Sequence, residues 1–190
     1  ISAYLIPHPV IRKITFTGST PVGKQLAALA GTHMKRVTME LGGHSPVLVF
    51  PDADVEEAAE TCARGKFRNN GQTCVCANRI YVQAGVYDAF AAKLKVAVEK
   101  LNVGDGLEPG VTTGPLINME AVEKVKEHMD DVVANGGAVL TGGKPHANGG
   151  SFFQPTIVTG VTQSMKVAQE ETFGPLAPLF KFEDEDEVIA

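Results

Sequence analysis

The sequence predicts an α/β fold in which strands alternate with helices and pair in parallel. Short apolar runs at 11–16, 35–41 and 47–50 are typical of buried strands. The longer segments 87–101 and 122–132 have apolar residues at spacings of three and four, which indicates amphipathic helices. Strands and helices that alternate along a chain favour a parallel sheet packed between helices.

Capping residues predict where two other helices begin. Thr20 followed by Pro21 is a good N-cap, because its hydroxyl can accept a first-turn amide and proline suits the first helical position. Asp54 with Glu57 three residues later forms a capping box. A further strand is expected at 152–158.

The composition indicates an ordinary globular protein. Hydrophobic residues make up 44% of the 190 residues, and the formal net charge is -5. This mild acidity argues against a nucleic-acid partner, because phosphate binding needs a clustered positive field. No apolar stretch approaches the roughly 20 residues of a membrane span. The one dense charge run, 183–187, is acidic and predicts the solvated first turn of a helix.

The three cysteines are an odd number, which favours a reducing compartment over a disulfide scaffold, and we expect a cytoplasmic protein. The chain begins at Ile1 without a methionine, so a targeting segment could precede it. It ends at Ala190, just after an acidic helix start. We therefore interpret it as an internal fragment of a longer protein.

A glycine-containing turn at 18–24 is the first candidate site. It resembles the opening of a P-loop, in which backbone amides hold phosphates. Gln25, however, stands where Mg²⁺ needs a hydroxyl, and Pro21 removes one amide, so a nucleotide triphosphatase is disfavoured. A strand-to-helix turn whose helix start can face a pyrophosphate remains, beside the alternative of a turn that serves packing alone.

A carboxylate at the end of a strand is the second candidate. Glu40 is followed by Leu41 and two glycines, at the edge where parallel sheets open toward ligands. A partly desolvated glutamate there can act as a general base near neutral pH. The alternative is a surface glutamate before a turn.

Cys74, in the polar loop 69–76, is the third candidate. A buried structural cysteine normally lies in an apolar run, as Cys62 does. A thiol among small polar residues can instead be exposed and activated as a nucleophile. A metal site is disfavoured, because Cys74 and Cys76 supply only two ligands and the five histidines lack metal-site spacing.

A fourth segment, 170–175, ends in a rigid Gly-Pro pair, and its composition assigns it no role. In this order the four segments resemble the aldehyde dehydrogenase superfamily, over essentially the whole chain. The matching pieces are Phe16-Thr17-Gly18-Ser19, Glu40-Leu41-Gly42-Gly43, Gly71-Gln72-Thr73-Cys74 and Glu171-Thr172-Phe173-Gly174-Pro175.

The resemblance implies a role for each matching position. Cys74 would attack the aldehyde and pass through a thiohemiacetal and a thioester, and Glu40 would activate the hydrolytic water. The resemblance also implies that NAD or NADP is bound, and it does not distinguish between the two. The implied cofactor contacts are Gly18 and Ser19 at the pyrophosphate, Leu41 near the nicotinamide, Glu171 on the nicotinamide ribose and Phe173 against the ring.

The segment 66–79 resembles the succinate-semialdehyde dehydrogenase branch of the superfamily. That resemblance places Arg68 on the distal carboxylate of the substrate, which a guanidinium can hold in a fixed bidentate geometry. A structural salt bridge is the alternative for Arg68. Succinate semialdehyde is therefore the predicted substrate, and glutarate semialdehyde is the alternative, because its enzyme would have similar residues here.

Cys76 has a second interpretation besides packing. Together with Cys74 it could close a reversible disulfide that blocks the nucleophile under oxidising conditions. The alternative is that Cys76 packs at the start of the following strand.

The resemblance also implies a domain organisation. Residues 1–43 are expected to be the C-terminal part of a Rossmann-like dinucleotide-binding domain, and residues 44–190 most of a catalytic domain with a parallel sheet. A homo-oligomer, dimer or tetramer, is implied in the same way, and the isolated fragment is expected to be inactive. A non-catalytic protein on the same fold is the remaining alternative.

Overall fold

The computed structural model describes residues 1–190, which form two compact units, Ile1–Gly43 and His44–Ala190. None of the helices combines the length and the apolarity that crossing a bilayer requires. The assignment of the two units to a cofactor domain and a catalytic domain stays a prediction.

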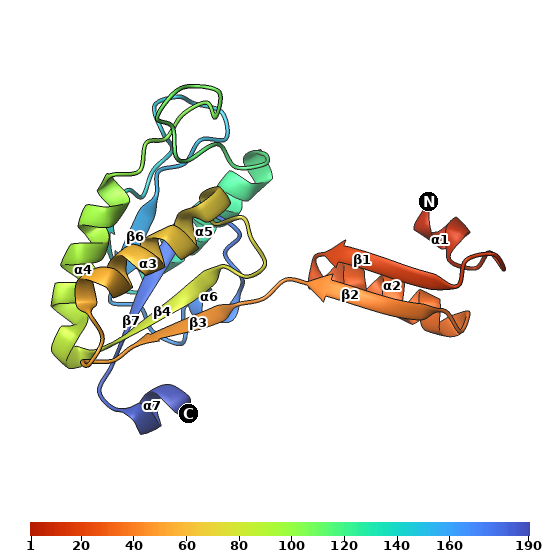
Figure 1. Ribbon diagram of the computed structural model, residues 1–190, viewed down its shortest axis with the longest axis horizontal. Helices are drawn as coiled ribbons and strands as arrows, with labels where there is room; N and C mark the ends of the chain where they lie inside the picture. Colours follow the sequence, from red (N-terminus) through yellow and green to blue (C-terminus); the bar gives the residue numbers. More distant parts are fainter. The chain divides into compact units, whose positions relative to one another are not determined.

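The first unit is a β-α-β arrangement preceded by a short helix. Its elements are α1 (Ser2–Leu5), β1 (Lys13–Gly18), α2 (Thr20–Thr32) and β2 (Arg36–Leu41). The strands pair in parallel with Gly18 opposite Leu41, and α2 packs against both of them (Figure 1). The two strands therefore end together, and the residues at their carboxyl ends are neighbours.

Helix α2 begins one residue earlier than its sequence predicts. Its N-cap is Ser19, not Thr20, and Ser19 makes no side-chain capping bond. The backbone of Ser19 is extended, with φ -67° and ψ 145°, and its carbonyl accepts the first helical hydrogen bond, from the amide of Gly23 at 2.9 Å. Pro21 tolerates either start, because first-turn amides have no intrahelical acceptor.

The second unit contains a five-stranded sheet. Its strands are β3 (Ser45–Val49), β4 (Ala77–Gln83), β5 (Ala138–Thr141), β6 (Thr156–Thr159) and β7 (Leu176–Phe182), in the order β3-β4-β7-β6-β5. Neighbours are parallel except β5 and β6, which are antiparallel. The predicted parallel sheet is therefore confirmed for four strands. A loop without a helix joins β5 to β6, which suits an antiparallel pair because no crossover is needed.

Helices cover both faces of this sheet. The helical elements of this unit are α3 (Val55–Phe67), the 3-10 turn η1 (Arg68–Gly71), α4 (Ala84–Glu99), α5 (Met119–Ala134), α6 (Lys166–Gln169) and α7 (Glu185–Ile189). Figure 1 shows α3 and α4 together on one face, whereas α5 and α6 belong to the opposite core. Asp54 caps α3 as predicted, because its carboxylate accepts the amides of Glu56 and Glu57, both at 3.0 Å.

Alternation along β4 separates two hydrophobic cores. Ile80 and Val82 belong to the core under α3 and α4, and Tyr81 belongs to the core under α5. The first core also contains Phe67, Phe90, Leu94, Ile157 and Leu179, and the second contains Val125, Phe153, Val158, Leu176 and Phe180. This three-layer packing fixes the loops that enter the sheet.

Strand β7 is central in the sheet, and alternation does not predict it. Its residues are buried at every position except Lys181, so they show no period of two. Pro178 also interrupts the run, and proline lacks the N–H that a central strand normally uses. The structure places Pro178 where β7 changes partners, since 176–178 pair with β6 and 179–182 pair with β4.

The strand that the sequence predicts at 152–158 is shorter than expected. It begins only at Thr156, because Phe153 instead forms an isolated bridge with Pro145. Helix α7, by contrast, begins within the acidic run as predicted, and its first turn holds three carboxylates.

Candidate active site

Cys74 lies on an exposed turn in the loop 69–76, which we call the thiol loop. The amide of Cys76 donates to the carbonyl of Thr73 at 3.1 Å and closes this turn around Cys74. All three cysteines are free, and both Cys62 and Cys76 are buried. The sulfur of Cys74 is therefore the accessible thiol of this unit.

The thiol loop begins with three consecutive residues in the left-handed region. Asn69, Asn70 and Gly71 have φ values of 50°, 58° and 72°. Asparagine tolerates this conformation better than most residues. Gly71 is required for a second reason, because a Cβ there would lie 2.1 Å from the carbonyl oxygen of Gly174. The thiol loop therefore contacts the segment 170–175, which we call the glutamate loop.

Side-chain amides fix the thiol loop to the connection before α5. Asn70 is 2% exposed, and its Nδ2 donates to the carbonyl of Gly114 at 3.0 Å. Gln72 donates from Nε2 to the carbonyl of Pro115 at 3.3 Å and accepts the amide of Ile117 at Oε1, at 2.9 Å. These bonds hold the backbone on the amino-terminal side of Cys74.

Lys66 lies beneath the thiol loop and is 0% exposed. Its Nζ donates to Oδ1 of Asn78 at 2.6 Å, and its carbonyl accepts the thiol of Cys76 at 3.4 Å. Burial lowers the pKa of Lys66, while the Cys76 thiol and the charge of Glu171 raise it. Cys76 thus packs at the start of β4, which is the alternative considered above, and its disulfide with Cys74 stays a prediction.

Sequence patterns could have revealed Lys66. Helix α3 buries Ala59, Cys62, Ala63 and Phe67 along one face, and Lys66 occupies the same face. A lysine on an apolar stripe is rare unless it is paired. Its position therefore signals a structural role close to the thiol.

The glutamate loop alternates between buried and exposed side chains. Thr172 is 1% exposed, Phe173 is 44% exposed and Glu171 is half-buried. Thr172 meets His128 of α5, whose Nδ1 lies 2.7 Å from the threonine hydroxyl. His128 is 0% exposed, and the sequence analysis assigns it no function. It shares the buried face of α5 with Val125, and a histidine on an apolar helix face is the signal that could have indicated it.

Four predicted residues of the first unit gather at one edge. Gly18 ends β1, Ser19 follows it, and Glu40 and Leu41 end β2. The parallel register pairs Gly18 with Leu41. The side chain of Leu41 packs against Gly23 of α2, since a Cβ on Gly23 would lie only 2.4 Å from Cδ2 of Leu41. Glu40 is exposed. Successive side chains of a strand point to opposite faces, so the exposed carboxylate of Glu40 lies on the face of β2 away from α2.

Arg68 begins η1, directly before the thiol loop. It is exposed and takes part in none of the ion pairs of residues 1–190. The structural salt bridge considered above therefore has no counterpart in this structure. A guanidinium in this position is available to an anionic ligand.

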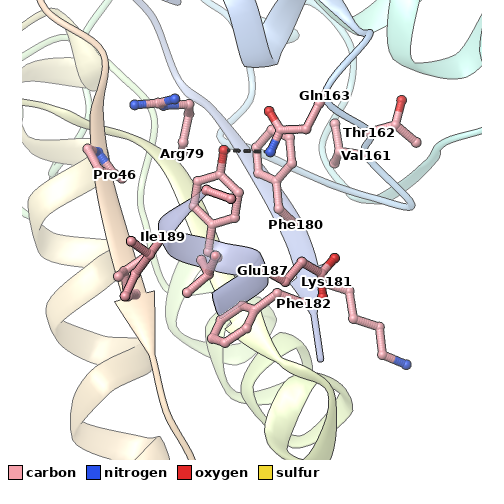
Figure 2. A pocket seen from close by; sticks show the side chains of 14 residues that line it. Pro46, Arg79, Val161, Thr162, Gln163, Phe180, Lys181, Phe182, Glu187 and Ile189 are labelled. Carbon is pink, nitrogen blue, oxygen red and sulfur yellow. Dashed lines mark hydrogen bonds between the residues drawn. The ribbon is translucent and has the colours of Figure 1, made fainter. Parts of the chain in front are cut away.

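A depression of about 750 Å³ over β3, β4 and β7 contains none of these residues. Figure 2 shows Arg79 and Gln163 at its edge, and Gln163 donates to the hydroxyl of Tyr81 at 2.9 Å. No group of three or more His, Cys, Asp or Glu side chains in residues 1–190 is arranged to hold a metal ion. The candidate catalytic and binding residues therefore lie in the thiol loop, in the glutamate loop and at the carboxyl ends of β1 and β2.

Residues 1–190 match the aldehyde dehydrogenase family along their whole length. The chain belongs to this family. The family predicted from the four sequence segments is thereby confirmed.

Several curated relatives share more than half of their residues with the chain. It is 58% identical over 190 residues to a glutarate-semialdehyde dehydrogenase of Pseudomonas aeruginosa, with 100% of this chain and 39% of the relative covered. It is 57% identical over 189 residues to a 3-sulfolactaldehyde dehydrogenase of Pseudomonas putida, with the same coverage. It is 57% identical over 186 residues to the NADP(+) succinate-semialdehyde dehydrogenase of Escherichia coli, with 98% and 39% covered. The chain thus spans 39% of the length of these relatives.

Solved structures of family members share the fold. The crystal structure of an E. coli NADP-dependent enzyme matches with a TM-score of 0.98 and 56% identity, over 100% of this chain and 39% of that chain. A succinate-semialdehyde dehydrogenase from Burkholderia pseudomallei matches with a TM-score of 0.97 and 54% identity, over 99% and 39%. These matches confirm the predicted α/β class.

Replacing Gly71 by alanine is expected to destabilise the second unit. The left-handed conformation alone costs a non-glycine residue about 1–3 kcal/mol, and the contact with the Gly174 carbonyl adds to this cost. Gly65→Ala is the matched control, because nothing lies within 4 Å of a Cβ there. That variant should gain about 0.5–1 kcal/mol from helix propensity. The urea midpoint measures the stability of each variant. Equal midpoints for Gly71→Ala and Gly65→Ala would contradict the contact between Gly71 and Gly174.

The stability of the second unit is expected to fall as the pH falls through 6.5, the ordinary pKa of histidine. Burial lowers the pKa of His128 from its ordinary value of 6.5, although the hydrogen bond that its Nε2 donates to Glu170 raises it in part. The unfolded chain then binds more protons than the folded one, so acid favours unfolding. His128→Gln should flatten the dependence of the urea midpoint on pH. Burial of His44 lowers its pKa too, so part of the dependence remains.

The control for this pH experiment is His146→Gln, at a partly exposed histidine outside the contacts of His128. Its midpoint should follow the same pH curve as the parent chain. If the urea midpoint of His128→Gln depends on pH as strongly as that of the parent chain, the titration of His128 does not cause the loss of stability in acid.

Proposed function

We propose that this chain, within an enzyme of the length of its relatives, oxidises an aldehyde to the acid with Cys74 as the nucleophile. The exposed thiol of Cys74 on a turn held from several sides carries this proposal. The contact between Gly71 and Gly174 supports it, because it joins the thiol loop to the loop assigned to the cofactor.

In the proposed reaction the thiolate of Cys74 adds to the carbonyl carbon and forms a thiohemiacetal. Loss of a hydride from that carbon leaves a thioester, which water cleaves to release the acid and the thiol. Glu40 acts as the general base that takes a proton from this water. Sulfur suits both halves of the sequence, because a thiolate is a strong nucleophile and its thioester is readily hydrolysed.

The residues fit a nicotinamide dinucleotide, NAD or NADP. Ser19 makes no side-chain bond to the first turn of α2, so the amides there can face a phosphate. Glu171 offers a carboxylate to ribose hydroxyls, and Phe173 and Leu41 offer apolar surface to the nicotinamide. The bound dinucleotide supplies the hydride acceptor that the oxidation requires.

The proposed substrate is a short semialdehyde with a distal carboxylate, with succinate semialdehyde preferred and glutarate semialdehyde the second candidate. Arg68 supports it, because an exposed guanidinium without an ion pair can hold a carboxylate in a bidentate geometry. The names of three relatives also support it, since each includes an aldehyde that bears an acidic group. A homo-oligomer in the cytoplasm belongs to the same proposal.

Two substitutions in the full-length enzyme test the mechanism. Cys74→Ala should abolish oxidation, and Glu40→Gln should lower kcat by about 10²–10⁴-fold, the usual contribution of a general base. Because only hydrolysis fails, Glu40→Gln should still release one equivalent of reduced dinucleotide in a rapid burst. Glu60→Gln, at an exposed glutamate of α3, is the control. Full steady-state activity without Cys74 would refute the mechanism.

The substrate proposal predicts a selective effect of Arg68→Ala. The Michaelis constant for succinate semialdehyde should rise about 10–100-fold, the range for a lost charge-assisted hydrogen bond, whereas that for butanal should stay constant. Arg64→Ala is the control, because Arg64 is an exposed arginine that bonds Thr61 of its own helix. Equal losses on both aldehydes would remove Arg68 from the substrate site.

A further inference from the structure

His128 bridges two residues of the glutamate loop. Its Nδ1 lies 2.7 Å from Oγ1 of Thr172, and its Nε2 lies 3.2 Å from Oε2 of Glu170. These two residues flank Glu171 in the sequence. One imidazole ring therefore holds the loop on both sides of that glutamate.

The partners of the ring determine its tautomer. The carboxylate of Glu170 can only accept, so Nε2 of His128 must donate to it. In a neutral ring the other nitrogen is then an acceptor, so Nδ1 accepts a hydrogen bond from the hydroxyl of Thr172. All hydrogen-bonding atoms of the buried ring are thereby satisfied, as burial requires.

Charged neighbours keep Glu170 directed at the ring. Lys124 of α5 donates from Nζ to the same carboxylate oxygen at 2.5 Å. Lys124 also pairs with Glu127 at 3.3 Å, and Glu127 pairs with Lys166 of α6. Burial lowers the pKa of His128, which agrees with a neutral ring. The Glu170 side of the bridge is therefore part of a network of charged side chains from α5, α6 and the glutamate loop.

The same helix supports the glutamate loop at a second point. A Cβ on Gly174 would lie 2.3 Å from Cγ2 of Val125, one turn before His128. The carbonyl of Gly174 in turn approaches Gly71 of the thiol loop. Helix α5 thus holds the loop on both sides of the exposed Phe173 and backs the contact with the thiol loop.

We propose that His128 is a positioning residue that fixes the backbone of Glu171 so that its carboxylate can hold the ribose of the dinucleotide. This inference rests on the proposed function, which assigns Glu171 to the ribose. His128 touches neither substrate nor cofactor in this assignment. It acts through Thr172 and Glu170, and its loss should weaken dinucleotide binding more than aldehyde binding.

Thr172→Val in the full-length enzyme tests the bridge, because it removes the hydroxyl and keeps the shape. The Michaelis constant for the dinucleotide should rise about fivefold to tenfold, the factor that one neutral hydrogen bond is worth. The constant for the aldehyde should change by less than about twofold. A purely structural defect lowers the folded fraction, which reduces the apparent kcat and leaves both constants unchanged.

Two variants serve as controls for Thr172→Val. Thr113→Val replaces another threonine that is 1% exposed, but the hydroxyl of Thr113 has no hydrogen-bond partner. It should leave both Michaelis constants unchanged. Thr172→Ser retains the hydroxyl and should restore the dinucleotide constant to nearly the parent value. An equal rise in Thr172→Val and Thr113→Val would overturn the proposal.

His128 itself can be replaced in two complementary ways. His128→Asn keeps a polar atom near Nδ1, and His128→Gln keeps one near Nε2, so each retains one side of the bridge. Both should raise the dinucleotide constant by less than His128→Ala does. If all three variants leave that constant unchanged while remaining folded, the positioning role is wrong.

Glu171→Gln separates this inference from the function on which it rests. If it leaves the dinucleotide constant and kcat unchanged, Glu171 does not hold the ribose, and both proposals fail at this residue. If it raises the constant whereas Thr172→Val does not, the proposed function stands and the role of His128 is refuted.

Discussion

The carbonyl oxygen of Gly174 occupies the space that a side chain on residue 71 would need. This close approach is possible only because glycine lacks a Cβ and can adopt the left-handed conformation found there. Asn69 and Asn70 share that conformation, so the chain turns sharply before Cys74. The arrangement of the candidate site depends on this contact, because it brings a thiol and a half-buried glutamate from distant parts of the sequence into adjoining loops.

Two buried polar side chains stabilise these loops, and each would cost free energy if it lost its hydrogen-bond partner. Lys66 and His128 are both 0% exposed, and a buried polar group without partners costs free energy. Each has partners that belong to the site or border it. Lys66 bonds Asn78 at the start of β4, and His128 bonds Thr172. The buried groups therefore couple loop geometry to stability, since a loop displacement would leave a polar atom unsatisfied.

Sequence patterns locate both loops, because each is a glycine-containing segment between apolar runs. They cannot show that the loops meet, since one backbone contact between Gly71 and Gly174 joins them. Sequence patterns could have indicated that Lys66 and His128 are buried polar residues, because both interrupt the apolar stripe of a helix. They could not predict strand β7, since its burial on both faces removes the alternation of apolar and polar residues. Capping propensity likewise cannot choose between adjacent Ser and Thr residues, so the start of α2 shifts by one.

The two loops approach the sheet from the same side. The thiol loop runs directly into β4 and the glutamate loop into β7, and these strands are parallel neighbours with Ile80 opposite Leu179. Both loops therefore lie at the amino edge of the sheet, whereas the first-unit residues lie at the carboxyl edge of theirs. The register of β4 against β7 consequently sets how far the thiol stands from the glutamate. A core substitution that slides one strand along the other would separate the two groups without touching either.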